Sequence, residues 1–256
     1  MFEGMARTMH ARSAALLASI ESSLDRIMRM WLLFAALAVA VRIALSPIPG
    51  GIEPATLAPY LLLIIGPAAS MALALRWFAE GDSMAQPTIR LARVGQWRSI
   101  GRTRAMRHSL YGTGGIMVSL LVGMLLNVPL RSVEYLAAMP ALSGPVPAWL
   151  ETLHLMMTID VVLLSSLYTI AFVAALRRVP SFPRLLVAIW LLDLAMQIAT
   201  AQVVAGHPQL PRHVAGALRP LLEGNIQKVL IGVSLWLPYL LLSNRVNITF
   251  RHRIPA

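Results

Sequence analysis

The sequence contains no cysteine among its 256 residues, and only 13% of its residues are charged. The first absence excludes a disulfide framework, a thiol nucleophile and any zinc or iron–sulfur site that depends on cysteine. The second absence separates the chain from soluble domains, in which about 25% of residues are charged. With 57% hydrophobic residues and a mean hydropathy of +0.69, the composition is typical of a protein embedded in a bilayer.

The signatures of common soluble enzymes are also missing. The sequence has no G-x-S-x-G, no P-loop and no H-E-x-x-H, and His154, His207 and His213 do not have the spacing of metal ligands. We therefore expect no catalytic residue, no bound metal and no cofactor. An intramembrane enzyme is the alternative, but no residue stands out as its nucleophile.

Six apolar runs account for most of the chain. Each is about 18 to 24 residues long, which is enough to cross roughly 30 Å of hydrocarbon as a helix. The sequence therefore predicts an all-α fold, a polytopic membrane helix bundle with six transmembrane helices. The runs lie at about residues 30–47, 57–78, 110–128, 153–176, 184–205 and 226–243.

The net charge of +11 has three possible explanations: binding of nucleic acid, binding of anionic lipid, or membrane topology. The distribution of the basic residues along the chain favours topology. Lys and Arg in short loops resist translocation, so they accumulate on the cytoplasmic side. We expect a bacterial inner-membrane protein with both termini in the cytoplasm. A cleaved signal peptide ending near Ala38-Val39-Ala40 is the competing interpretation of the first run. The side expected to be cytoplasmic carries Arg7, Arg12, Arg26, Arg29, the segment 90–107, Arg177, Arg178, Arg184, Arg245, Arg251 and Arg253; the opposite side carries Arg131, Arg212 and Arg219, and the connection 48–56 carries no basic residue.

The segment 90–107 concentrates basic residues next to a span. It is either a topology determinant or a docking surface for anionic lipid, to which each basic side chain contributes about 1 kcal/mol. We do not expect nucleic acid, because no recognition module accompanies the charge. A membrane-protein partner is a further expectation. The arginines of the segment are Arg90, Arg93, Arg98, Arg102, Arg104 and Arg107.

An amphipathic pattern precedes the first apolar run. Apolar residues recur at helical spacing from Leu16 to Met28, with polar residues between them. This pattern predicts a cytoplasmic interfacial helix ahead of the first span.

Charged residues inside hydrocarbon are candidates for a functional site, because they are costly and usually face the interior of a bundle. Asp193 lies near the middle of the fifth run, and Gln197 and Thr200 follow at i+4 and i+7, on the same helical face. If no cation reaches Asp193, we expect it to be protonated, which is the state that a proton relay needs. A hydrogen bond to Gln197 would be the structural alternative.

Three further charges fall in the outer third of the expected spans: Arg42, Asp160 and Lys228. They could form one ion cluster. The structural alternative is that Arg42 and Lys228 reach the interface with their long side chains, leaving Asp160 to bond locally.

The end of the chain carries a recognisable pattern. The pattern consists of Gly224-Asn225, Trp236-Leu237-Pro238-Tyr239 and the run from Ser243 to Phe250, which includes Arg245, Val246 and Thr249. It resembles the closing signature of an uncharacterised bacterial family of four-span membrane proteins, of the domain of unknown function 2569 type.

Two further features extend that resemblance to about residues 110–250. Arg177-Arg178 and Phe182-Pro183-Arg184 lie between two spans, and Gly114-Gly115 opens another, although Ile116 stands where the family commonly has Trp. The resemblance implies a four-helix transmembrane domain over 110–256 with a short cytoplasmic tail. Residues 1–109 would add the interfacial helix, two spans and the basic loop. It implies no activity.

The closing signature has a physical interpretation of its own. Trp236 and Tyr239 suit the membrane interface, and Pro238 would distort the last helical turns. The alternation of Val246, Ile248 and Phe250 with polar residues predicts a short extended tail against the bundle.

Two functions fit these observations. The first is a structural or accessory envelope protein with no enzymatic activity. The alternative is a small transporter or proton-coupled carrier that uses Asp193 and the cluster of Arg42, Asp160 and Lys228.

Overall fold

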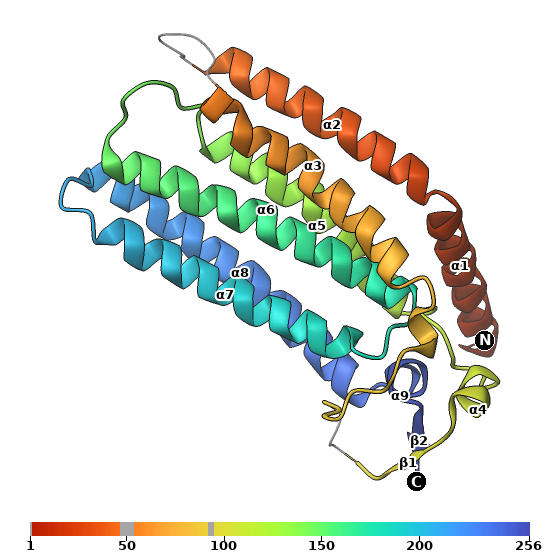
Figure 1. The fold of residues 1–256 in the computed structure, drawn as a ribbon. Helices are drawn as coiled ribbons and strands as arrows, with labels where there is room; N and C mark the ends of the chain where they lie inside the picture. Colours follow the sequence, from red (N-terminus) through yellow and green to blue (C-terminus); the bar gives the residue numbers. More distant parts are fainter. Residues whose placement is uncertain (1, 47–53, 92–94) are drawn as a thin grey trace.

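The computed structural model describes residues 2–46, 54–91 and 95–256, and six long helices dominate it (Figure 1). All six are long and apolar enough to cross a membrane. They confirm the all-α bundle with six spans. The spans are α2 (Leu24–Leu45), α3 (Pro54–Trp77), α5 (Met117–Ala138), α6 (Ala148–Leu176), α7 (Phe182–Ala205) and α8 (Arg212–Leu242).

The third and sixth spans differ most from their expected bounds. The third span was expected at 110–128, but α5 begins at Met117 and continues through Pro129 to Ala138. The sixth begins fourteen residues before the expected 226, because α8 includes Pro220. Membrane helices tolerate proline because neighbouring groups compensate for the lost hydrogen bond. Arg131 therefore lies inside a span and not in an outer connection.

The helix α6 forms the centre of the bundle and packs against α3, α5 and α7. Its approach to α3 is close: a Cβ on Gly66 would lie 3.3 Å from Ser166 Oγ and 3.4 Å from Val162. By contrast, α8 buries only Leu222, Val229 and Leu240 among its described residues. The bundle is thus tight around α6 and loose along α8.

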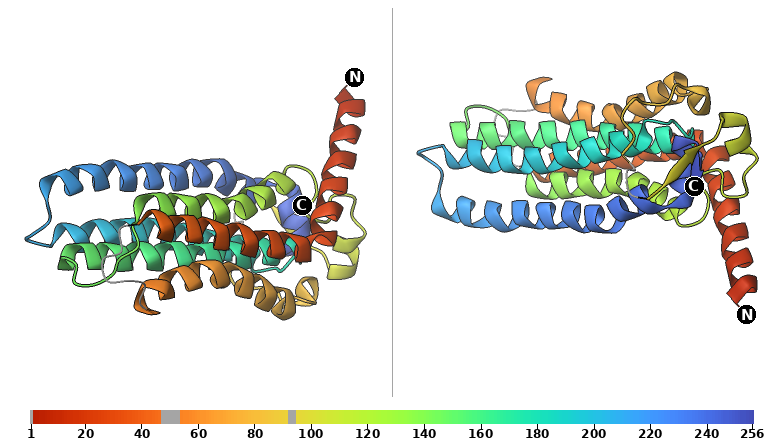
Figure 2. Two further views of the ribbon diagram at one scale, coloured as in Figure 1. Left: turned by 90° about the horizontal axis from the view of Figure 1, so that it is seen from above. Right: turned by 90° about the horizontal axis from the view of Figure 1, so that it is seen from below.

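Both termini lie at the same end of the bundle, as an even number of spans requires (Figures 1 and 2). A small lobe covers this end. It contains the 3-10 turn Gly81–Ser83, α4 (Arg102–Met106), α9 (Asn244–Arg251) and the antiparallel pair of β1 (Trp97–Ser99) and β2 (Arg253–Pro255), in which Arg98 pairs with Ile254. Ile100, Ala105 and Ile248 form its apolar core.

The prediction of an extended tail was wrong. The run after Ser243 forms helix α9, and the Ser243 side chain accepts a hydrogen bond from the Val246 amide at its start. The alternation of apolar residues failed as a guide because polar Asn247 and Thr249 are buried as well, and both have hydrogen-bond partners. The tail does lie against the bundle, as expected.

The amphipathic segment before the first span is helical, but it is divided. Helix α1 (Phe2–Ser22) ends one residue before Ser23, and α2 begins at Leu24, so Ile27 and Met28 belong to the first span. Figure 2 shows α1 leaving the bundle crosswise at the end where the termini lie. Arg93 and most of the 48–56 connection lie outside the described residues.

Candidate functional site

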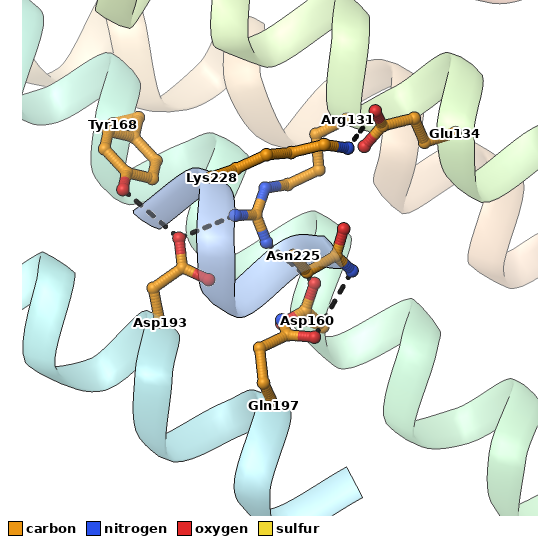
Figure 3. A network of polar contacts seen from close by, with 8 residues as sticks. All are labelled: Arg131, Glu134, Asp160, Tyr168, Asp193, Gln197, Asn225 and Lys228. Atoms are coloured by element: carbon orange, nitrogen blue, oxygen red, sulfur yellow. Dashed lines mark hydrogen bonds and ion pairs between the residues drawn. The ribbon is translucent and has the colours of Figure 1, made fainter. Parts of the chain in front are cut away.

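Four spans contribute polar side chains to one buried network (Figure 3). At its centre the guanidinium of Arg131, on α5, bridges two carboxylates. Its Nη1 donates to Asp160 Oδ2 of α6 at 2.8 Å, and its Nη2 donates to Asp193 Oδ2 of α7 at 2.6 Å. The Arg131 side chain is 14% exposed and that of Asp193 is completely buried. Charge-assisted bonds of this kind are among the strongest in proteins.

Neutral groups complete the network. The Tyr168 hydroxyl of α6 donates to Asp193 Oδ2 at 3.2 Å, and Gln197 Nε2 of α7 donates to Asp160 Oδ1 at 2.9 Å. Asn225 of α8 donates to Gln197 Oε1 at 3.3 Å. Three of the four carboxylate oxygens are therefore bonded. Asp193 Oδ1 is buried and has no hydrogen-bond partner among the described residues.

The network lies on the wall of a cavity of about 740 Å³ between α5, α6, α7 and α8. Asp160, Asp193 and Arg131 share this wall with apolar and aromatic side chains, which include Trp190 and Trp236. A volume of this size is typical of small-molecule sites, and so is an apolar lining with a few convergent polar groups.

The expected face of Asp193, Gln197 and Thr200 is confirmed, because all three are buried on α7. The expected bonding is different. Arg131 reaches Asp193, and Gln197 bonds to Asp160 and not to Asp193. The sequence left open that no cation reaches Asp193. In the structure, Arg131 does reach it.

The structure does not assemble the expected cluster of Arg42, Asp160 and Lys228. Arg42 Nε donates to the Met139 carbonyl at 2.8 Å, at the C-terminal end of α5, where the helix dipole favours a cation. Lys228 forms an ion pair with Glu134 of α5, and both side chains are substantially exposed. Asp160 alone of the three belongs to the buried network.

The closing pattern of the chain divides between two places. Its first part belongs to the cavity, since Gly224 and Trp236 line it and Asn225 joins the network. Within α8, the Trp236 ring packs edge-on against the ring of Tyr239, with Pro238 between them in the helix.

The second part of the pattern holds the lobe to the start of α5. Arg245 Nη1 donates to the Gly112 carbonyl at 3.4 Å, and the Gly112 amide donates to Thr249 Oγ1 at 3.0 Å. The Phe250 ring packs on Phe182 at the start of α7, with 5.0 Å between ring centroids. The pattern therefore connects α8 and α9 to α5 and α7.

One protein family, described as a protein of unknown function (DUF2569), matches residues 110–251, which is more than half of the chain. The chain belongs to the DUF2569 family. Comparisons with curated proteins and with solved structures give no significant match.

The DUF2569 region contains every residue of the buried network, from Arg131 on α5 to Asn225 on α8. Ile116, at the position where the resemblance led us to expect Trp, is 63% exposed just before α5. The spans α2 and α3 lie outside the matched region and pack against α5 and α6 within it. The division of the chain at residue 110 stays a prediction.

Sequence reasoning missed Arg131, Glu134 and Tyr168. A signal for two of them was present, because Asn127, Arg131 and Glu134 follow one another at i, i+4 and i+7. That spacing puts all three on one helical face, and all three line the cavity. The apolar run ends at residue 128, before Pro129, and this end hides the continuation of the helical face.

Burial shifts the pKa values of several side chains in the lobe. Burial lowers the pKa of Arg251 to about 10, and the charge of Arg253 adds to the effect. Arg251 Nη1 donates to the Leu240 carbonyl at 2.8 Å and to Asn247 Oδ1 at 3.2 Å. Burial also raises the pKa of Tyr111, over whose ring the Arg178 guanidinium lies 5.7 Å from the centroid.

Proposed function

We propose that this multipass membrane protein is a small proton-coupled carrier whose exchange site is the network of Asp160, Arg131 and Asp193. The observation that carries the proposal is the buried, unbonded Oδ1 of Asp193, a residue that lines a cavity of about 740 Å³. A buried carboxylate oxygen without a partner is costly, and a proton or a cationic ligand removes that cost.

The charges around Asp193 support exchange of a single proton. Arg131 faces it from α5, and Asp160 and Tyr168 face it from α6. From α8, Lys228 approaches the cavity but is paired with Glu134. Two cations thus stand against three carboxylates, and one proton makes the cavity neutral.

The accessory role is the second candidate. It has the support of the sequence pattern but of no particular feature of the site. A purely structural bundle gains little from three buried charges, because an apolar replacement of a buried ion pair is often as stable or more stable. Stability alone therefore does not explain this buried ion-pair network, and a function explains it better.

Infrared difference spectroscopy tests the proposal on the full chain in lipid, from about pH 5 to pH 9. We expect a carboxyl band that titrates in this range and disappears in Asp193→Asn. Asp160→Asn serves as the matched variant, since it removes a carboxylate from the same network and should leave a band from Asp193. If no band of Asp193 changes over the range, the residue is locked, and the accessory role is favoured.

We further propose that both termini face the cytoplasm of a bacterial inner membrane. The placement of Arg131 inside α5 supports this, because the basic residues near the opposite end of the described chain are then Arg212, Arg219 and Arg42, the last of these in the final turn of α2. Since the chain has no cysteine, introduced cysteines report without background. An impermeant maleimide should label Gln209→Cys but not Thr103→Cys in spheroplasts, and the reverse labelling would overturn the orientation.

A further inference from the structure

In the cavity that holds the buried network, the cations are fully paired, but one carboxylate oxygen is not. Its two cations are both satisfied by carboxylates: Arg131 by Asp160 and Asp193, and Lys228 by Glu134. Among the carboxylates, Asp193 keeps an oxygen without a partner among the described residues. The bonding capacity that remains in the network thus belongs to a carboxylate, whereas the cations are already bonded, and this difference favours a cationic ligand over an anionic one.

The rest of the wall suits an apolar molecule. Trp190, Trp236, Tyr135 and Tyr168 line the cavity together with leucine, valine and methionine side chains. The faces of aromatic rings attract cations, and the attraction increases when both partners are removed from water. Apolar and aromatic walls around one net negative charge are therefore complementary to a lipophilic cation.

Glycines border the cavity on α5 and α8. At Gly123, Gly224 and Gly232 an added Cβ would meet nothing within 4 Å, and all three residues line the cavity. All three also lie within membrane-spanning helices. At these three positions the space between α5 and α8 is therefore bordered by bare backbone at the depth of the bilayer, where a lipophilic molecule concentrates.

We infer that the cavity binds a monovalent lipophilic organic cation in exchange for the proton of Asp193. This inference rests on the proposed carrier function and names its substrate class. With Asp193 protonated, the cavity has two positive and two negative charges. When the cation binds and the proton leaves to water, three positive charges, the ligand's included, face three negative ones. The cavity therefore has no net charge either with the proton bound or with the cation bound. Neither state leaves an uncompensated charge in hydrocarbon.

The test uses the full chain in lipid nanodiscs and tetraphenylphosphonium as the probe, with empty nanodiscs subtracted. Tetraphenylborate has nearly the same shape and the opposite charge, so it controls for simple partition. We expect saturable binding of tetraphenylphosphonium, release of about one proton per cation, and an affinity that increases up to about tenfold per pH unit while Asp193 is protonated. Tetraphenylborate should show no saturable binding.

Two variants test the site. Asp193→Asn should reduce the affinity for tetraphenylphosphonium at least tenfold and abolish its pH dependence. Gly232→Leu fills open space and replaces a weak helix former, so it should fold while it blocks the cavity. It should weaken binding of the probe and leave the infrared band of Asp193 titrating.

The outcomes distinguish failure of the proposed substrate class from failure of the proposed carrier function. Equal binding of the two probes, or binding unchanged in both variants, overturns the substrate class. Absence of saturable tetraphenylphosphonium binding while the Asp193 band titrates also overturns it, and leaves the carrier function standing. If the band does not titrate either, both proposals fail together.

Discussion

The side chain of Arg245 lies across the backbone of Gly115, so that a Cβ on Gly115 would stand 3.5 Å from the guanidinium Nε. The contact joins α9, at the end of the chain, to the turn that begins α5. Gly115 has a φ of +68°, which residues with side chains rarely adopt. Its amide also donates to Ser13 Oγ at 3.0 Å, so α1 is tied to the same turn.

Gly115→Ala should therefore destabilise the protein by about 1–2 kcal/mol, because the left-handed conformation is strained for alanine. The adjacent Gly114→Ala is a matched control: a Cβ there would meet its nearest atom, Arg245 Nη1, at 3.7 Å, and Gly114 does not have a positive φ. Thermal unfolding in one detergent measures both. Equal losses of stability in the two variants would show that contact with the added Cβ, and not the backbone conformation of Gly115, causes the destabilisation.

The sequence predicted the helical bundle well, because the length of an apolar run and the period of its polar residues are local properties. The face of Asp193, Gln197 and Thr200 was found in this way. The same argument applied to Asn127 and Arg131 would have extended the third span. Pro129 is the opposing signal, because proline usually ends a helix in soluble proteins, whereas membrane helices often continue through it.

The pairing of charges could not be predicted in the same way. Lys228 pairs with Glu134 and not with Asp160, although all three line the same cavity. The choice depends on how four helices are rotated and shifted against one another, and this depends on packing over the whole bundle. A single sequence contains no local signal of it. The lobe at the termini was missed for the same reason, because β1 and β2 are far apart in sequence.

Arg131→Gln should destabilise the bundle strongly, by about 3–5 kcal/mol, because it leaves Asp160 and Asp193 buried without their shared counter-charge. The matched control is Lys228→Gln, which breaks an exposed pair and should change stability by only about 0–1 kcal/mol. The midpoint of thermal unfolding at one pH compares the two variants.

A triple variant shows whether charge explains that loss. Combining Arg131→Gln with Asp160→Asn and Asp193→Asn makes the network neutral and keeps its shape. We expect the triple variant to be clearly more stable than Arg131→Gln alone. If it is no more stable, the packing of Arg131 and not its charge holds the helices together.

His252 should make the lobe sensitive to acid. Burial lowers the pKa of His252 below its usual 6.5, with Arg102 and Arg90 acting in the same direction and Asp82 opposing them. The unfolded chain therefore takes up the proton first, and stability is lost as the pH falls from about 6.5 towards the folded pKa. Protonation of Nδ1 would also remove the acceptor that faces Gln86 Nε2 at 3.4 Å.

His252→Asn is the test, because asparagine tolerates the left-handed conformation of this residue, whose φ is 50°. The variant should unfold at nearly the same temperature at about pH 8 and about pH 5.5, after correction for the other titrating groups, whereas the parent protein should lose stability at the lower pH. His108, which is exposed, provides the control through His108→Asn. A parent and a His252→Asn variant with the same acid sensitivity would rule out His252 as its source.

The basic segment 90–107 should bind anionic lipid. Arg98, Arg104 and Arg107 are exposed at the end of the bundle that holds the termini. At about 1 kcal/mol for each side chain, replacing the three by glutamine should reduce the preference for anionic over zwitterionic lipid by up to roughly a hundredfold. Arg102 is left in place because it pairs with Asp82 at 3.1 Å.

Spin-labelled phosphatidylglycerol and phosphatidylcholine measure that preference on the reconstituted protein. Arg212→Gln with Arg219→Gln is the control, since α8 begins at the opposite end of the bundle (Figure 1). The control should retain the preference of the parent protein. The fall caused by the loop variant should be smaller in high salt, because salt screens exposed charges. If the loop variant keeps its preference, the arginines of 98–107 serve topology alone, and lipid selection must come from elsewhere on the chain.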